Sequence, residues 1–269
     1  MIENRFVVVI AFLVMSISNI ISTTSNLYNH TNNTKISQEN PTALTPDGIT
    51  FAIWGPIYLF ELGTVVYQCY KKGSLIKDST REWLATAFTL NAVWLLLFAY
   101  EYWWLSLLVI MAYAWILVEL YSWDLHIDYG NDKHWKDKLW GYTGVSLNLA
   151  WVTVATLLNI TIVFRNSRIV FTLSGTSIVG GNPDWAVACI VAASVIAIHK
   201  LVHSADIPYG LATAWALFGI YRNQEEEQHK WALVFAITLL ASTFVRLLLC
   251  VRSTRGKKTP LEDNLLGHT

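Results

Sequence analysis

The chain has 269 residues, of which 54% are hydrophobic and 14% are charged, and its 19 basic and 19 acidic side chains cancel. An ordinary soluble domain carries about 25% charged residues, so this composition excludes a soluble globular enzyme and a disordered chain. Without a net positive charge there is no electrostatic field to attract phosphate, so a nucleic-acid binder is excluded as well.

Eight apolar segments follow one another along the chain. They cover residues 6–22, 49–70, 83–99, 103–121, 140–164, 185–203, 207–222 and 231–250. A helix that crosses a bilayer needs about 20 mostly apolar residues, and each segment approaches or reaches that length. The sequence therefore predicts an all-α, polytopic membrane helix bundle of about eight transmembrane helices, with the lipid bilayer as a partner.

Lys and Arg are distributed unevenly between the connecting segments. If the N-terminus is cytoplasmic, the cytoplasmic segments hold 14 of the basic residues and the opposite segments hold 5. Cytoplasmic loops carry an excess of Lys and Arg. We therefore predict an integral, multi-pass membrane protein with both termini cytoplasmic, and the sequence does not indicate which membrane it occupies.

The first apolar segment has a second interpretation. A short basic start, an apolar core and a Ser/Thr-rich exit also describe a signal peptide, whose cleavage would leave seven spans. No small-x-small site stands out between Ser16 and Ser25, which favours an uncleaved helix, and both alternatives stay open. The loop that follows carries two N-glycosylation sequons, at Asn29 and Asn32.

The second segment combines aromatic residues with Pro and Gly. Trp54 and Tyr58 are four residues apart and share a helix face. Pro56 is expected to lie mid-helix and to favour a kink. Gly55 and Gly63 are expected to allow a neighbouring helix to approach closely. A kinked helix with an aromatic face can line a cavity, although helix packing without a ligand explains the same pattern.

The third and fifth segments place amide side chains beside tryptophans. Asn91 and Trp94 share one helix face, and Trp151, Ala155 and Asn159 form one stripe. An Asn in hydrocarbon usually faces the bundle interior, where it finds a partner. Three tryptophans from three helices are therefore expected to converge with two amides around a flat, apolar ligand.

These motifs resemble the TspO/MBR family, also called translocator protein or tryptophan-rich sensory protein. The matching residues are Pro46, Trp54, Gly55 and Tyr58 on its second helix, Asn91 and Trp94 on its third, and Trp151, Ala155 and Asn159 on its fifth. The resemblance covers about residues 5–165 and implies a five-helix unit over residues 1–165. Three additional transmembrane helices, which the short family members lack, are expected over 166–252, and a basic polar tail over 253–269.

The resemblance also implies a function. Members of this family bind porphyrins, sterols and drug-like compounds between their helices, so the chain is expected to bind a porphyrin, another tetrapyrrole or a sterol-like molecule and to sense or move it. The ligand-binding residues that carry over are Trp54, Tyr58, Asn91, Trp94, Trp151 and Ala155. The resemblance implies no firm cofactor, and porphyrin is the candidate ligand. A homodimer is a possible partner arrangement. The sequence departs from the family at Gly48, where many members have Trp. The loss of this Trp is expected to weaken porphyrin binding.

Glu61 is the strongest candidate for a proton or ion site. Intramembrane carboxylates are costly and often functional, and Glu61 falls within the second apolar segment. The alternative function is a small-molecule secondary transporter that uses this carboxylate. No motif for nucleophilic or phosphate chemistry is present, and His199 and His203 lie at a span end, where His is typically interfacial. We therefore expect no enzymatic turnover, no catalytic residues and no metal site.

Overall fold

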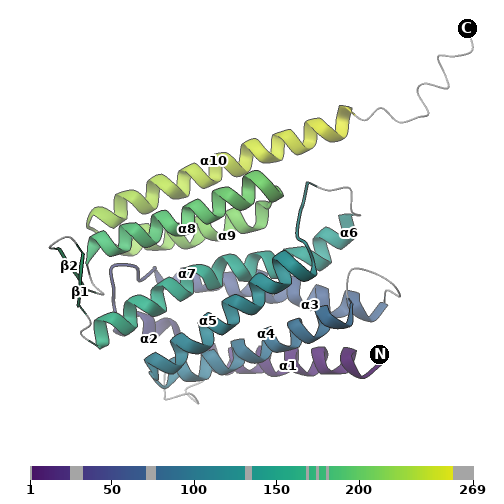
Figure 1. Cartoon of the computed structure of the whole chain (residues 1–269), viewed down its shortest axis with the longest axis horizontal. Helices are drawn as coiled ribbons and strands as arrows, with labels where there is room; N and C mark the ends of the chain where they lie inside the picture. Colours follow the sequence, from purple (N-terminus) through teal and green to yellow (C-terminus); the bar gives the residue numbers. More distant parts are fainter. Residues whose placement is uncertain are drawn as a thin grey trace, which may run out of the picture.

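Long helices run almost parallel to one another along the long axis of the molecule in the computed structural model (Figure 1). The structure describes residues 2–24, 33–70, 77–130, 135–167, 170–173, 176–179 and 182–256. The two predicted glycosylation sequons, at Asn29 and Asn32, lie outside the described residues.

The long helices follow the predicted apolar segments. They are α1 (Ile2–Thr24), α3 (Trp54–Tyr70), α4 (Asp78–Ala99), α5 (Trp103–Glu119), α7 (Thr143–Asn166), α8 (Pro183–Ser204), α9 (Ile207–Asn223) and α10 (Glu227–Gly256). Within the described residues, seven helical segments are long and apolar enough to cross a membrane. The seventh predicted segment, 207–222, forms α9, whose 17 residues are not among the seven spans. The predicted all-α, polytopic membrane bundle is confirmed.

Short elements connect the long helices. They are α2 (Asn33–Glu39), the 3-10 helix η1 (Gly48–Ile53), the π-helical turns η2 (Leu120–Asp124) and η3 (Lys138–Tyr142), α6 (Trp135–Asp137), and the strands β1 (Val170–Leu173) and β2 (Thr176–Val179). The antiparallel β1–β2 hairpin, which pairs Val170 with Val179, was not expected from the sequence. It lies at the end of the molecule opposite to the start of α1 and the end of α10 (Figure 1).

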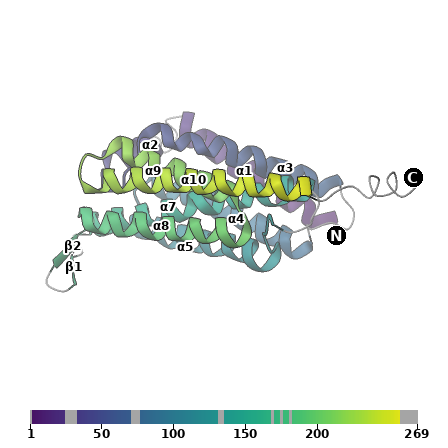
Figure 2. The same cartoon turned by 90° about the horizontal axis from the view of Figure 1, so that it is seen from above.

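The central helix of the bundle is α7. It packs against α3 and α5 of the predicted five-helix unit and against α9 of the additional helices. Its residues Ala150, Ile162 and Val163 are fully buried. Figure 2 shows the bundle from above, and both views place the start of α1 and the end of α10 at the same end of it. This placement fits an even number of membrane crossings.

The start of α3 differs from the sequence expectation. Asp47 caps η1, and the chain changes from a 3-10 helix to an α-helix at Trp54, whose backbone N–H donates to the carbonyl of Phe51. Pro56 therefore lies in the first turn of α3. Since η1 runs directly into α3, the first turn of α3 continues a helical path, and the N–H of Trp54 already has carbonyl partners in η1. The predicted mid-helix position of Pro56 is therefore wrong for α3 itself, and the kink stays a prediction.

The two glycines of α3 also differ from each other. A Cβ atom at Gly63 would lie 2.2 Å from the ring of Trp140, so the close approach predicted there is confirmed. A Cβ atom at Gly55 would meet no atom within 4 Å. The close approach predicted at Gly55 is wrong, because that residue lies on an exposed face of the helix.

Candidate functional site

Three tryptophans from three helices meet inside the bundle. The ring centroid of Trp54 on α3 lies 6.4 Å from that of Trp94 on α4 and 6.1 Å from that of Trp151 on α7. All three side chains are buried. Tyr58 stacks on Trp54, with centroids 5.3 Å apart and ring planes inclined by 18°. The convergence of three tryptophans that the helix faces suggested is present in the structure.

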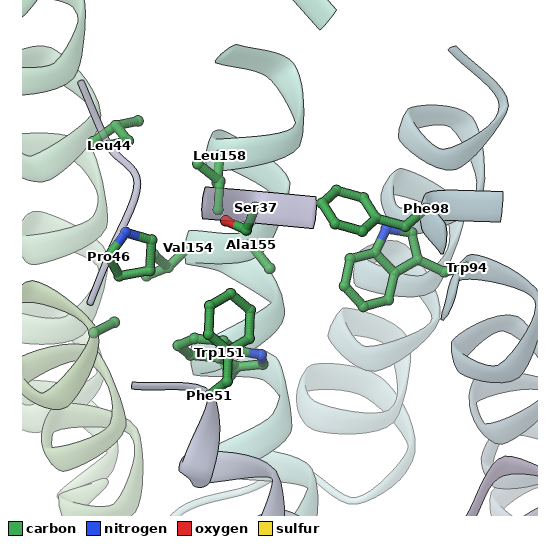
Figure 3. Close-up of a pocket in the computed structure, with 11 residues that line it drawn as sticks. Ser37, Leu44, Pro46, Phe51, Trp94, Phe98, Trp151, Val154, Ala155 and Leu158 are labelled. Carbon is green, nitrogen blue, oxygen red and sulfur yellow. The ribbon is translucent and has the colours of Figure 1, made fainter. Parts of the chain in front are cut away.

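An enclosed cavity lies beside this aromatic cluster (Figure 3). Its walls are formed by Ser37, Leu44, Pro46, Phe51, Trp94, Phe98, Trp151, Val154, Ala155, Leu158 and Ala216. The free volume of the cavity is about 20 Å³, which is enough for one or two water molecules. Ligand pockets usually measure about 300–1,000 Å³. The cavity is therefore closed around its own side chains.

The six predicted ligand-binding residues fall into two layers. The wall of the cavity contains Trp94, Trp151 and Ala155. The layer behind it contains Trp54, Tyr58 and Asn91. Trp54 connects the layers, because it contacts both wall tryptophans and stacks on Tyr58. Sequence reasoning missed Phe51 and Ala216 as wall residues, since neither belongs to a polar or tryptophan motif.

The indole N–H groups of the two wall tryptophans differ in their surroundings. Trp94 Nε1 donates to Asn159 Oδ1 at 3.1 Å, and Ser106 Oγ also bonds to this amide oxygen. Trp151 Nε1 is buried and has no hydrogen-bond partner among the residues that the structure describes. A buried donor without a partner costs about 1–3 kcal/mol. Trp151 thus has an unused donor beside the cavity, whereas Asn159 is occupied by Trp94.

The end of α9 holds the segment that covers the cavity, residues 40–47, which we call the lid segment. Asn223 Nδ2 donates to the carbonyl of Thr45 at 3.1 Å. Gln224 Nε2 donates to the carbonyls of Thr42 at 3.1 Å and Thr45 at 2.8 Å. Leu44 of the lid segment lies over the cavity (Figure 3). The additional helices therefore contact the predicted site, which the sequence did not reveal.

An open groove of about 370 Å³ runs along η1, α3, α7 and α9. It is lined by Ala52, Ile53, Pro56, Leu147, Leu211, Ala212 and Trp215. The groove and the enclosed cavity use consecutive residues of η1, Phe51 and Ala52, and consecutive residues of α9, Trp215 and Ala216. Trp215 Nε1 also donates to the carbonyl of Thr50 at 2.8 Å and ties α9 to η1. The groove and the cavity therefore lie on neighbouring residues of η1 and α9.

A network of hydrogen bonds connects Tyr58 to residues of other helices across the bundle. Asn19 Nδ2 on α1 donates to Tyr58 Oη at 2.7 Å, and Tyr58 Oη donates to Asn91 Oδ1 at 3.4 Å. Asn91 Nδ2 then donates to Tyr113 Oη on α5 at 3.2 Å. Asn91 thus has the partners that a buried amide requires, and they are polar groups of the protein.

Glu61 lies at the far end of this hydrogen-bond network, and the exposed fraction of the residue is 3%. Asn148 Nδ2 on α7 donates to both Tyr113 Oη and Glu61 Oε1. Glu61 Oε2 and Asn148 Oδ1 are buried, and neither has a hydrogen-bond partner in the described part of the chain. Sequence reasoning found Glu61 but missed Asn148. The signal was the same one that pointed to Asn91, an amide within an apolar span.

A second buried carboxylate, Asp206, caps the N-terminus of α9 outside the long helices. It accepts hydrogen bonds from the N–H of Tyr209 at 2.9 Å, from Ser146 Oγ at 2.6 Å and from Tyr121 Oη at 2.7 Å. Burial raises the pKa of Asp206 above its ordinary value, and the hydrogen bonds, that from Ser146 first, oppose this shift. Asp206 therefore joins α9 to α7 and η2.

Among the described side chains, no three His, Cys, Asp or Glu residues gather to hold a metal ion.

Comparison with known proteins bears on the identity of this bundle. A family model described as TSPO-like protein matches residues 5–251, and the match runs from α1 to α10. No curated protein and no solved structure matches the chain. The division of the chain at residue 165 stays a prediction. Because the match covers most of a chain whose helices form an integral, multi-pass membrane bundle, this protein belongs to the TSPO-like protein family.

Proposed function

We propose that this protein binds a planar apolar ligand, a porphyrin, another tetrapyrrole or a sterol-like molecule, and senses or moves it without enzymatic turnover. The observation that supports this function is the meeting of Trp54, Trp94 and Trp151 beside one cavity. Aromatic rings stack favourably on planar ring systems. Trp151 adds an unpaired N–H for a ligand with a hydrogen-bond acceptor.

Binding requires the cavity to open. The free 20 Å³ is too small for a tetrapyrrole, but the neighbouring groove adds about 370 Å³ once their shared wall moves. Phe51 and Trp151 form part of this wall, with ring centroids 5.7 Å apart in an edge-to-face arrangement. The groove opens on the surface of the bundle within the membrane-spanning helices. The ligand therefore enters from the hydrocarbon phase.

A tryptophan-fluorescence titration with protoporphyrin in nanodiscs tests this function. The wild type is expected to show saturable quenching. Trp54→Phe and Trp151→Phe should each weaken the affinity about 3- to 10-fold, since an aromatic pair is worth about 0.5–1.5 kcal/mol. Trp231→Phe is the matched control, because Trp231 is exposed on α10. Non-saturable quenching that is equal in all four proteins would exclude a protoporphyrin site at the cluster.

We place both termini in the cytoplasm. The start of α1 and the end of α10 lie at the same end of the bundle (Figure 1), and the segments predicted on that side hold 14 of the 19 basic residues. An epitope fused to the C-terminus should bind antibody only after the membrane is permeabilised. Binding to intact cells would reverse the orientation.

A second candidate function is a secondary transporter in which Glu61 carries the coupling proton or ion. The observation that favours it is the hydrogen-bonded connection from Glu61 to Tyr58, which stacks on Trp54. In proteoliposomes with a pH gradient, protoporphyrin flux should then be lost in Glu61→Gln while binding is retained. Equal flux in both proteins would remove this candidate.

A further inference from the structure

Several polar groups in the hydrogen-bond network around Glu61 have no partner among the described residues. Tyr113 Oη accepts from the amides of Asn91 and Asn148, so in the described part of the chain its own proton has no acceptor. Glu61 Oε2 and Asn148 Oδ1 also lack partners. A buried polar network in a bilayer is expected to pair its groups, because no water is available as a substitute.

The amide of Asn148 can take a second orientation. Half a turn about its Cβ–Cγ bond exchanges the oxygen and the nitrogen, which have nearly the same shape. Asn148 Nδ2 lies 2.5 Å from both Glu61 Oε1 and Tyr113 Oη. An oxygen of Asn148 at this position would give the hydroxyl proton of Tyr113 the acceptor that it lacks among the described residues.

With the oxygen there, both neighbours must donate. Tyr113 donates its hydroxyl proton, which then has its missing acceptor. Glu61 can donate only if its carboxyl group carries a proton. This arrangement leaves Glu61 Oε2 and the Asn148 nitrogen unpaired, but it places no net charge inside the bundle, where an unpaired carboxylate is strongly unfavourable.

Among the described side chains, no positive charge faces Glu61 to stabilise its ionised form. The elements packed on α3 are α1, η1, α7 and η3. Their described charged side chains have other partners: Arg5 lies against the carbonyl of Cys69, Asp47 pairs with Arg222, Lys138 donates to the carbonyl of Tyr129, and Arg165 donates to that of Pro41. The titratable groups that face Glu61 are the phenols of Tyr113 on α5 and Tyr58 on α3 itself, and α7 presents Asn148 and Gly144.

We propose that Glu61 is a proton-binding site that is occupied in the resting protein and that its proton controls the aromatic cavity. When the proton leaves to water, the carboxylate needs the amide nitrogen of Asn148, so the amide turns. Tyr113 then loses its acceptor, and the rearrangement passes through Asn91 to Tyr58, which stacks on Trp54. The control of the cavity rests on the proposed ligand site, whereas the proton site itself does not.

Infrared spectroscopy in nanodiscs at neutral pH tests the proton site directly, because a protonated carboxyl group has its own carbonyl band. We expect a band component that is lost in Glu61→Gln and kept in Asp206→Asn, the matched control at the other buried carboxylate. The glutamine amide has the donor and the acceptor of the neutral acid, which favours folding. If that variant does not fold, Tyr113→Phe should shift the same component, since Glu61 becomes the sole donor to Asn148. A spectrum without a component that depends on these residues overturns the proposal.

Protoporphyrin titrations across a range of pH test the control of the cavity. Wild type and Glu61→Gln should have the same affinity at acidic pH, where Glu61 is protonated. At alkaline pH the affinity of the wild type for protoporphyrin should fall severalfold more than that of Glu61→Gln. The pH dependence of the variant's affinity reports only the titration of protoporphyrin itself. Parallel curves overturn the proposed control. Absence of saturable binding in both proteins at every pH would instead remove the proposed ligand site, and the infrared result would still decide the proton site.

Discussion

Arg222 Nε on α9 lies 3.0 Å from Oδ2 of Asp47, the residue that caps the 3-10 helix leading into α3. The next two residues along the chain, Asn223 and Gln224, bond to the carbonyls of the lid segment. Three consecutive side chains of the additional helices therefore hold the cover of the cavity. These contacts come from helices outside the predicted five-helix unit.

Gln224→Ala removes two of these contacts and should loosen the lid segment. We expect hydrogen exchange at the N–H of Asp47, which bonds to the carbonyl of Gly219 at 2.9 Å, to become about tenfold faster. Mass spectrometry of exchange in nanodiscs measures this rate. Lys230→Gln is the control, because it removes only an exposed ion pair with Glu227 on α10. Equal rates in the two variants would show that α9 does not hold the lid segment.

Gly63→Ala should destabilise the protein, because its new Cβ atom would lie 2.2 Å from the ring of Trp140. Overpacking of this kind typically costs about 1–3 kcal/mol. Gly55→Ala is the matched control in the same helix, where a Cβ atom meets open space. It should be neutral or slightly stabilising, since Ala favours a helix more than Gly does. Thermal unfolding in detergent compares the two, and equal midpoints would contradict the packing of η3 on α3.

Trp94→Phe should lower the stability more than Trp151→Phe. Both changes shorten a buried aromatic side chain, but only Trp94 loses a hydrogen bond, the one from Nε1 to Asn159. That bond is worth about 0.5–1.5 kcal/mol. Chemical denaturation of both variants in the same detergent measures the difference. A larger loss for Trp151→Phe would mean that the indole of Trp151 has a partner and would remove the unused donor from the site.

Asp206 should make the stability depend on pH. Its pKa is raised in the folded state, so the folded protein holds this proton more tightly than the unfolded chain does. The resulting stabilisation is present at low pH and is lost as the pH rises through the folded pKa. Asp206→Asn keeps an N-cap acceptor and cannot ionise. Its unfolding midpoint should therefore fall less steeply with rising pH than that of the wild type, and equal slopes would contradict the shift.

Asp206→Leu should be much more damaging than Asp206→Asn. The leucine removes the N-cap of α9 and leaves the hydroxyls of Ser146 and Tyr121 without their acceptor. The expected loss is about 2–4 kcal/mol, from the missing cap and the unpaired buried donors. Thermal unfolding at one pH separates the two variants. A leucine variant as stable as the asparagine variant would show that this junction does not join α9 to α7.

Local rules worked for the helices and failed at the start of α3. A membrane-spanning helix must satisfy its backbone within itself, so its position can be read from the apolar residues of one segment. The helical period also predicts that Trp54, Trp94 and Trp151 lie on the faces of their helices that point into the bundle. The chain before α3 forms a 3-10 helix that is bonded to α9 through Asp47 and Thr50. No residue pattern in that segment announces these distant partners.

The sequence by itself determined the membrane class, the long helices and the three tryptophans that meet between them, because each depends on composition or on spacing within one segment. Only the tertiary structure decided that the cavity is closed, that α9 holds its lid segment, and that Asn91 bonds with Tyr58 and Tyr113 in a network that ends at Glu61. These features join side chains that are far apart in the chain. Their distances are set by how whole helices pack, which no local period encodes.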